Sequence, residues 1–142
     1  MARLSFFTAV ALTIAGLVSA APIQEVDMSP FELAKRGGSY SGVATFFHPV
    51  SEGGPIGACG PKADNNSPIV ALNAPQYGNL NQKSDWCGKT ITITGPAGTT
   101  TATITDACPE CGHGSLDLTP AVFAKVVGDE AIGVGEITWS LN

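Results

Sequence analysis

Four cysteines restrict how this chain can fold. They stand between residues 59 and 111, at Cys59, Cys87, Cys108 and Cys111. Cysteines pair in an oxidising compartment, whereas in a reducing one they stay free, bind metal or carry out redox chemistry. Their meaning therefore depends on the compartment in which the chain folds.

The N-terminal residues predict export. Arg3 supplies a positive charge, residues 6–18 are almost wholly apolar, and small residues follow at 19–21. This order is typical of a secretory signal peptide, here residues 1–20. A transmembrane helix needs roughly 20 apolar residues, and this run is shorter. We therefore expect a secreted, extracellular protein.

A second segment, residues 21–36, precedes the sequence with strand-like patterns. It is polar and ends in Lys35-Arg36, directly before two glycines. Proteolysis is easiest in exposed, polar stretches, and the paired basic site resembles the processing sites of the fungal secretory pathway. The alternative is an ordinary linker that contains Lys-Arg. The change in composition favours a pro-segment at 21–36 and a working domain at 37–142.

The predicted working domain is one acidic unit by length and charge. Its four lysines and nine carboxylates leave a net charge of −5. Nucleic acids and anionic membranes are bound by basic patches, so neither partner is expected. The balance fits a soluble protein with neutral partners, polysaccharide among them. We expect a monomer without a cofactor.

Export favours disulfides over the other uses of cysteine. Four cysteines in a small exported domain predict two disulfides, with three connectivities open. A redox CxxC opens a helix in a βαβ unit, whereas Cys108-Pro-Glu-Cys111 follows a predicted strand. A structural zinc site needs four ligands, and only this pair has a suitable spacing. No metal is therefore expected.

The remaining sequence is mainly β in pattern. Strand signals cover residues 41–47, 90–94, 99–105 and 135–141, and the turn at 95–98 makes the middle pair a hairpin. Two short helices are predicted, at 71–77 and 121–127. The second has Thr119 as its N-cap and Gly128 after its last turn.

A resemblance extends over nearly all of residues 40–141. The stretches that carry it are Gly42 to Phe47, Gly57 to Gly60, Ile69 to Asn73, Cys87 to Ile93, Ala102 to Cys111, Gly114 to Phe123 and Gly133 to Trp139. In order and spacing they resemble secreted single-domain double-psi β-barrel proteins of the barwin, expansin and rare-lipoprotein-A-like group. The resemblance implies a six-stranded double-psi β-barrel with one or two short helices. It also implies that Cys59 pairs with Cys87 and Cys108 with Cys111.

The same resemblance implies a polysaccharide groove with two acids. In wall-active relatives the aspartate at the position of Asp106 lies in this groove as a catalytic or essential acid. A half-shielded carboxylate can have the raised pKa that general acid catalysis needs. Asp117 is implied on the same face. The alternative for Asp106 is that it caps the turn that follows it. The alternative for Asp117 is that its negative charge interacts favourably with the N-terminus of the second helix.

One position departs from the lytic relatives. Lytic transglycosylases of the rare-lipoprotein-A type have a histidine where our alignment places Asn73. An amide cannot carry a proton at neutral pH. We therefore expect a protein that lacks a complete catalytic set and leans away from being an enzyme.

Aromatic rings can stack on sugar rings, so exposed aromatics complete the predicted groove. Tyr77 and Trp86 lie in polar, loop-rich sequence and are the stronger candidates for exposure. Apolar anchors beneath loops are the alternative for each of them. The predicted groove residues are Tyr40, Phe47, Asn73, Tyr77, Trp86, Asp106 and Asp117.

Three functions fit these predictions. The preferred one is a non-hydrolytic module that binds or modifies cell-wall polysaccharide. Some short relatives inhibit papain-like cysteine proteases, and the clamped loop at 108–113 would then be the binding element, with a secreted protease as partner. A weak glycosidase or lytic enzyme that uses Asp106 is the third.

Overall fold

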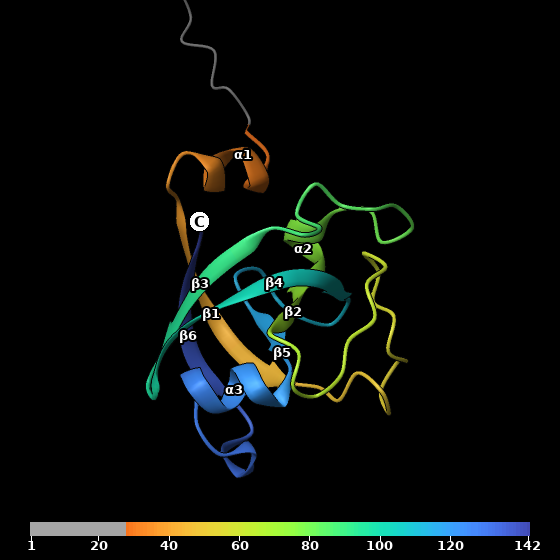
Figure 1. Cartoon of the computed structure of the whole chain (residues 1–142). Coiled ribbons are helices and arrows are strands. Elements are labelled where there is room, and N and C mark those ends of the chain that lie inside the picture. The colour runs from red at the N-terminus through yellow and green to blue at the C-terminus, as the bar shows by residue number, and fades with distance from the viewer. Residues whose placement is uncertain (1–27) are drawn as a thin grey trace, which may run out of the picture.

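Six strands close into a barrel. The computed structural model describes residues 28–142, so the predicted signal peptide lies outside the described residues. The strands run in the spatial order β1-β5-β2-β4-β3-β6 (Figure 1). Their bounds are β1 Ser39–Phe46, β2 Ile69–Asn73, β3 Thr90–Gly95, β4 Gly98–Cys108, β5 Leu116–Leu118 and β6 Gly135–Leu141.

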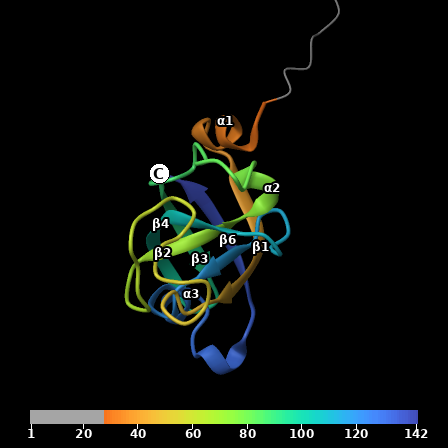
Figure 2. The same ribbon diagram turned by 90° about the vertical axis from the view of Figure 1, so that its right-hand side faces the viewer.

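Short helices lie at the two ends of this barrel. α1 (Pro30–Lys35) and α2 (Ala74–Tyr77) lie toward one end, and α3 (Pro120–Val126) lies toward the other, as both ribbon views show (Figures 1 and 2). A single 3-10 turn, Glu130–Ile132, follows α3. The predicted fold class is confirmed, because the described chain is a six-stranded closed barrel with only short helices.

The strand pairing mixes directions. β1 pairs with β5, and β2 with β4, in parallel; the other four pairs are antiparallel. The predicted hairpin is confirmed as β3–β4, with Gly95 opposite Gly98 at its turn. Because the barrel is closed, each of the strands described in residues 28–142 has a paired neighbour on both sides.

The core follows the alternation seen in the sequence. Ile91 and Ile93 of β3, and Ile137 and Trp139 of β6, are buried, while the residues between them face outward or are half-buried. Each fully buried side chain of this size contributes about 1.5–3 kcal/mol to stability. The period of two therefore fixes which face of the barrel wall is inside.

The predicted helix at 71–77 is wrong in its first half. Residues 71–73 belong to β2, and the helix begins only at Ala74. Asn73 is its N-cap and accepts a hydrogen bond from Gln76 N (3.1 Å), with Pro75 in the first turn. A cap followed by proline marks a helix start, so the strand ends where the cap begins.

The second predicted helix is confirmed as α3, shifted by one residue. Gly128 has φ +119°, and its N–H donates to the Phe123 carbonyl, so glycine ends the helix as expected. Thr119 does not cap with its side chain. Its hydroxyl instead donates to the carbonyls of Ser67 (2.6 Å) and Ile69 (3.3 Å), which ties α3 to the start of β2.

Both implied disulfides are present. Cys59 pairs with Cys87, and Cys108 pairs with Cys111. The first joins the loop before β2 to the segment before β3, and the second closes a tight loop directly after β4. Paired cysteines fit an oxidising compartment. Within residues 28–142 no cysteine is free, and no helix is long and apolar enough to cross a membrane.

Candidate functional site

Four neighbouring strands place a row of polar groups on one face. Thr45 of β1 is opposite Asp117 of β5, Asp117 is opposite Ala71 of β2, and Ala71 is opposite Asp106 of β4. Side chains of directly opposed residues project to the same side of a sheet. The two carboxylates therefore flank the small Ala71 side chain, with backbones about 9.5 Å apart across two strand spacings.

Asp117 is half-buried and bonds to the neighbouring strand β1. The Thr45 hydroxyl donates a hydrogen bond to its Oδ1 at 2.7 Å. Burial raises the pKa of Asp117, and the negative charges of Glu52 and Asp106 raise it further, while the Thr45 hydrogen bond opposes the change. A carboxyl that is reluctant to ionise can act as a hydrogen-bond donor or a general acid.

Asp106 is fixed by backbone amides. Its Oδ1 accepts hydrogen bonds from Ala58 N and Ala107 N, both at 2.8 Å. Gly57 makes this possible, because a Cβ there would lie 2.8 Å from the Asp106 Cβ and Cγ and 2.6 Å from the Thr105 carbonyl oxygen. Asp106 thus holds the loop at 57–58 against β4, instead of capping the turn that follows it, and still lines the groove.

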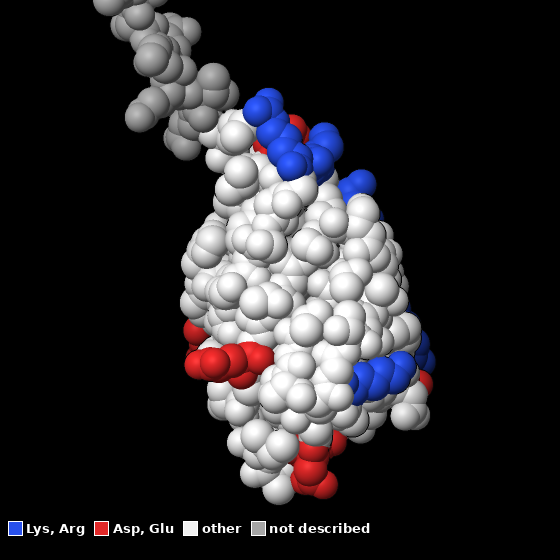
Figure 3. Space-filling model, turned by 90° about the vertical axis from the view of Figure 1, so that its left-hand side faces the viewer, with Lys and Arg blue, Asp and Glu red and all other residues white. Residues whose placement is uncertain are grey.

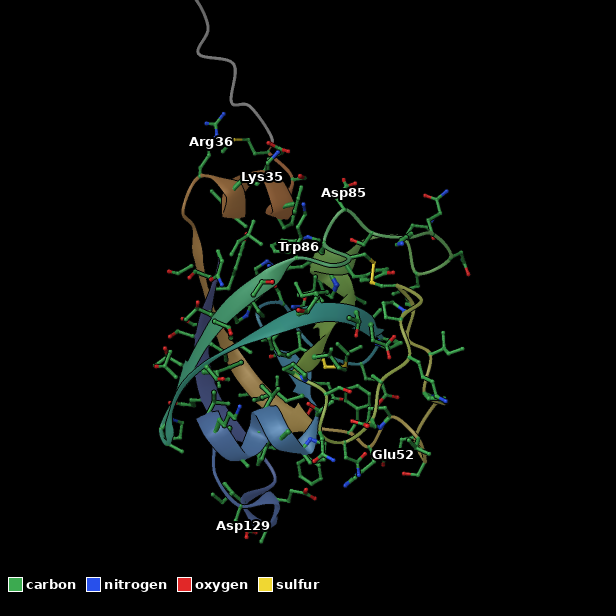
Figure 4. All side chains as sticks on the ribbon, viewed as in Figure 1. Lys35, Arg36, Glu52, Asp85, Trp86 and Asp129 are labelled. Atoms are coloured by element: carbon green, nitrogen blue, oxygen red, sulfur yellow. A yellow bond between two sulfur atoms is a disulfide. The ribbon has the colours of Figure 1, made fainter. Side chains whose placement is uncertain are left out.

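The two acids lie in a groove of about 710 Å³. We call this the acid groove. Acidic side chains and apolar ones share its lining, which consists of Phe46, Phe47, Glu52, Gly53, Ile56, Ala71, Asp106, Ala107, Cys108, Pro109, Glu110 and Asp117. A smaller hollow of about 320 Å³ continues from Asp117 and Glu110 along the Cys108–Cys111 loop toward Ser115. Figure 4 shows Glu52 on the loop side of the barrel, away from α1.

Only part of the predicted groove is in the acid groove. Phe47, Asp106 and Asp117 line it. The predicted exposure of Tyr77 and Trp86 is wrong, because both are buried, and Tyr40 and Asn73 are buried too. They lie around α2 and α1, where Tyr40 and Trp86 pack against Trp139 with ring centroids 4.6 and 5.7 Å apart.

Asn73 has a structural role in this structure. It is fully buried, and its Nδ2 donates to Gln76 Oε1 (2.7 Å) and to the Ser115 carbonyl (2.9 Å). The side chain thereby caps α2 and joins it to the segment before β5. It offers no group to the acid groove.

Sequence reasoning missed Thr45 and Glu52. Thr45 was read only as part of a strand, since its contact to Asp117 requires the parallel β1–β5 pair, and the three residues of β5 are too few for an alternation signal. Glu52 is placed by a turn, in which its Oε2 accepts from His48 N at 2.6 Å. That spacing of four residues was the available signal.

The histidines lie beside the site rather than in it. His48 Nδ1 is 3.4 Å from Glu52 Oε2, and its Nε2 is 3.5 Å from Glu130 Oε2. His113 is exposed, with its ring edge against Tyr40. In the part of the chain described, 28–142, no group of three His, Cys, Asp or Glu residues could hold a metal ion.

The chain is similar in sequence to a known expansin. No model of a known protein family matches the chain. It is 35% identical over 103 residues to Expansin-YoaJ of Bacillus subtilis, covering 72% of this chain and 38% of that protein. The chain spans only 30–38% of the length of the curated relatives it matches.

Two solved structures share the barrel. An expansin variant of Clavibacter michiganensis in complex with cellohexaose superposes with a TM-score of 0.62, at 28% identity over 74% of this chain and 50% of that one. The Streptomyces papain inhibitor superposes with a TM-score of 0.61, also at 28% identity, over 74% of this chain and 94% of the inhibitor.

Proposed function

We propose that this chain, which belongs to the double-psi β-barrel proteins that include expansins and the Streptomyces papain inhibitor, is a secreted, non-hydrolytic module that binds cell-wall polysaccharide. The observation that carries the proposal is the acid groove, in which two carboxylates lie on one face beside apolar side chains. Sugar sites combine such convergent polar groups with apolar surface.

The groove has suitable chemistry for sugar hydroxyls. Asp106 is held in place by two amide hydrogen bonds and Asp117 by one hydroxyl, so neither needs to be ordered by the ligand. Such preorganisation lowers the entropy cost of binding. Phe47 and Ile56 provide apolar surface at the same groove.

Hydrolysis receives less support than binding. Glycosidases need an acid and a second carboxylate placed around a scissile bond. Here the position of the lytic histidine is a buried helix cap, Asn73, and Asp106 is engaged in holding a loop. The residues of the acid groove therefore support binding of a polysaccharide chain more than its cleavage.

The test is a pull-down of secreted protein with insoluble cellulose, chitin and fungal wall glucan. We expect the wild-type protein to bind one of these and the Asp106→Asn/Asp117→Asn double variant to lose at least about tenfold in affinity, since two charge-assisted hydrogen bonds are worth over 1.4 kcal/mol. An Asp64→Asn variant is the matched control, because Asp64 lies in an exposed turn. Failure of the wild-type protein to bind all three polymers would refute the proposal.

Inhibition of a papain-like protease is the second candidate. The likeness to the papain inhibitor extends over 94% of that protein. The disulfide between Cys108 and Cys111 clamps a loop whose Pro109, Glu110 and His113 are exposed. Titration of papain with this protein decides it, and absence of inhibition at micromolar concentration excludes this function.

Export and processing belong to the same proposal. The two disulfides fit an extracellular protein. Lys35 and Arg36 are exposed at the end of α1, and the next residue is Gly37 in a turn with φ +84°. N-terminal sequencing of the secreted protein should give Gly37; a start at residue 21 or 22 would contradict the predicted pro-segment.

A further inference from the structure

The end of the pro-segment is folded onto the barrel. α1 and the residues beside it, 28–36, lie over one end of the molecule, next to the C-terminus of β6 (Figures 1 and 2). Ala34 is buried in the common core, and Phe31 packs against the same core. We call residues 28–36 the cap.

The cap covers an aromatic cluster. The Phe31 ring meets Trp86 edge to face, with centroids 5.2 Å apart. Trp86 also contacts Tyr40 (6.2 Å) and Trp139 (5.7 Å), and it is only 1% exposed. Figure 4 shows Trp86 at the end of the barrel that α1 covers. Loss of Phe31 would thus remove one of the three aromatic rings that contact the indole in the described residues.

Polar groups lie beside this cluster. The Tyr40 hydroxyl donates to the carbonyl of Pro30, which is a cap residue. Gln76 is 4% exposed, and within residues 28–142 its Nε2 forms no hydrogen bond of ordinary geometry, although the Gln76 side chain lies beside the Tyr40 hydroxyl. Its Oε1 is already used by Asn73 Nδ2 and Gly114 N. A buried donor without a partner costs roughly 1–3 kcal/mol, so it needs an explanation.

A hollow of about 360 Å³ lies beside this cluster. Ser29, Pro30 and Phe31 form its cap side, while Gln76, Tyr77 and Trp86 are among its barrel-side residues. Removing the cap would open this hollow, free the Tyr40 hydroxyl and expose the Trp86 ring. The opened hollow would then present the Trp86 ring and the Gln76 amide, with the Tyr40 hydroxyl next to the hollow rather than in its lining.

The two processing residues lie at the basic end of the molecule. Figure 3 shows lysine and arginine side chains gathered where the grey N-terminal residues emerge. Lys35 and Lys89 both lie over the Phe31 ring, at 5.4 and 5.7 Å from its centroid. Cleavage after Arg36 would leave the cap without a covalent link to the barrel.

We propose that residues 28–36 are an intramolecular cap over a second sugar subsite, formed by Trp86, Tyr40 and Gln76, and that processing after Arg36 uncovers it. The inference rests on the proposed polysaccharide binding and goes beyond it, because this subsite is separate from the acid groove. A sugar ring matches the opened hollow: its apolar face stacks on Trp86, and its hydroxyls bond to Tyr40 and to the free Gln76 amide. The cap places Phe31 and the Pro30 carbonyl where these groups would lie.

The first test measures uncovering without any ligand. Protein that begins at residue 21 and carries Arg36→Ala keeps the cap, and wild-type protein cut after folding by a protease specific for paired basic residues loses it. The chain has two tryptophans, and Trp139, which belongs to β6, is 2% exposed. We expect cleavage to red-shift the emission and increase acrylamide quenching. The emission of capped protein with Phe31→Ala should shift by part of this amount. An unchanged emission spectrum after cleavage would refute the proposal that residues 28–36 cover Trp86.

The second test measures binding of both forms to cellulose, chitin and fungal wall glucan. We expect the cleaved protein to bind about fivefold to tenfold more tightly, the gain from one aromatic stack. Gln76→Ala in the cleaved form should remove part of that gain and leave the stack on Trp86, while Asp106→Asn should weaken both forms equally. Equal binding by the two forms overturns the inference and leaves the proposed function standing. If neither form binds any of the three polymers, both the inference and the proposed function are wrong. If the cleaved protein binds only the free pro-peptide, the uncovered site is not a sugar subsite.

Discussion

At the scale of single residues, Asp117 couples the acid groove to stability. Burial raises its pKa in the folded protein, so the native state binds its proton more tightly than the unfolded chain does. Its contribution to stability is therefore full below the unfolded pKa near 3.9 and is lost as the pH rises through the folded pKa. We expect Asp117→Asn to stabilise the protein at pH 7 and to have little effect near pH 3, because Asn can still accept the Thr45 hydroxyl.

Urea unfolding at pH 7 and at about pH 3 measures this difference. Asp64→Asn is the control of opposite sign, because hydrogen bonds from the Ser67 hydroxyl and Asn66 N lower the pKa of Asp64. That variant should lose stability at pH 7. If Asp117→Asn instead destabilises the protein at pH 7, the carboxylate is better satisfied than its burial indicates.

Gly57 is required for a packing reason. A Cβ at this position would overlap the Thr105 carbonyl and the Asp106 side chain. We expect Gly57→Ala to cost about 1–3 kcal/mol, since the backbone of β4 or the loop must shift. Gly53→Ala is not a matched control, because Gly53 has φ +84°, whereas Gly112 has open space and no positive φ. Thermal unfolding of Gly57→Ala and Gly112→Ala should therefore separate, and equal losses would refute the argument.

At the scale of elements, the alternation in the sequence predicted the long strands but not the two short ones, β2 and β5. β3, β4 and β6 alternate over six or more residues, and each was predicted within a few residues of its bounds. β5 has three residues, which is too few for a period to emerge. Since β5 lies between β1 and β2, missing it also hid the Thr45–Asp117 contact. The site was therefore predictable in its acids, by resemblance, but not in its geometry.

The prediction that Tyr77 and Trp86 are exposed is wrong for a related reason. Trp86 precedes a disulfide cysteine in a polar loop, and such loops are usually exposed. The residues that cover it come from α1, β1 and β6, which are distant in sequence. Local composition reports only near neighbours, so it could not show that this loop folds onto the core.

The two disulfides should differ in what they stabilise. Cys59–Cys87 spans 28 residues and Cys108–Cys111 spans three. Loop-closure entropy predicts losses of about 3.6 and 1.6 kcal/mol when each pair is replaced by alanine. We expect the first replacement to lower the urea midpoint more, whereas the second mainly loosens the wall of the acid groove. Urea curves with polysaccharide binding or papain titration distinguish these effects, and a larger stability loss from the short loop would contradict the ranking.

At the scale of the whole molecule, we expect the barrel and its cap to unfold in one cooperative transition as long as the chain is intact after Arg36. All six strands and both disulfides lie within residues 39–141, so the barrel keeps its full pairing without the cap. The cap nevertheless adds the burial of Ala34 and part of Phe31. That apolar contact is worth about 1–2 kcal/mol, which corresponds to a Tm difference of roughly 4–10 °C for a domain of this size.

Calorimetry of one preparation before and after cleavage checks this difference. We expect the capped protein with Arg36→Ala to melt at the higher temperature, and the cleaved protein to melt lower but still in one cooperative transition. Phe31→Ala in the uncut chain should lower the Tm by part of that amount, because it removes the contact to Trp86 and keeps the link. Since the cleaved barrel retains its closed sheet, two separate transitions would contradict this account, as would an identical Tm before and after cleavage.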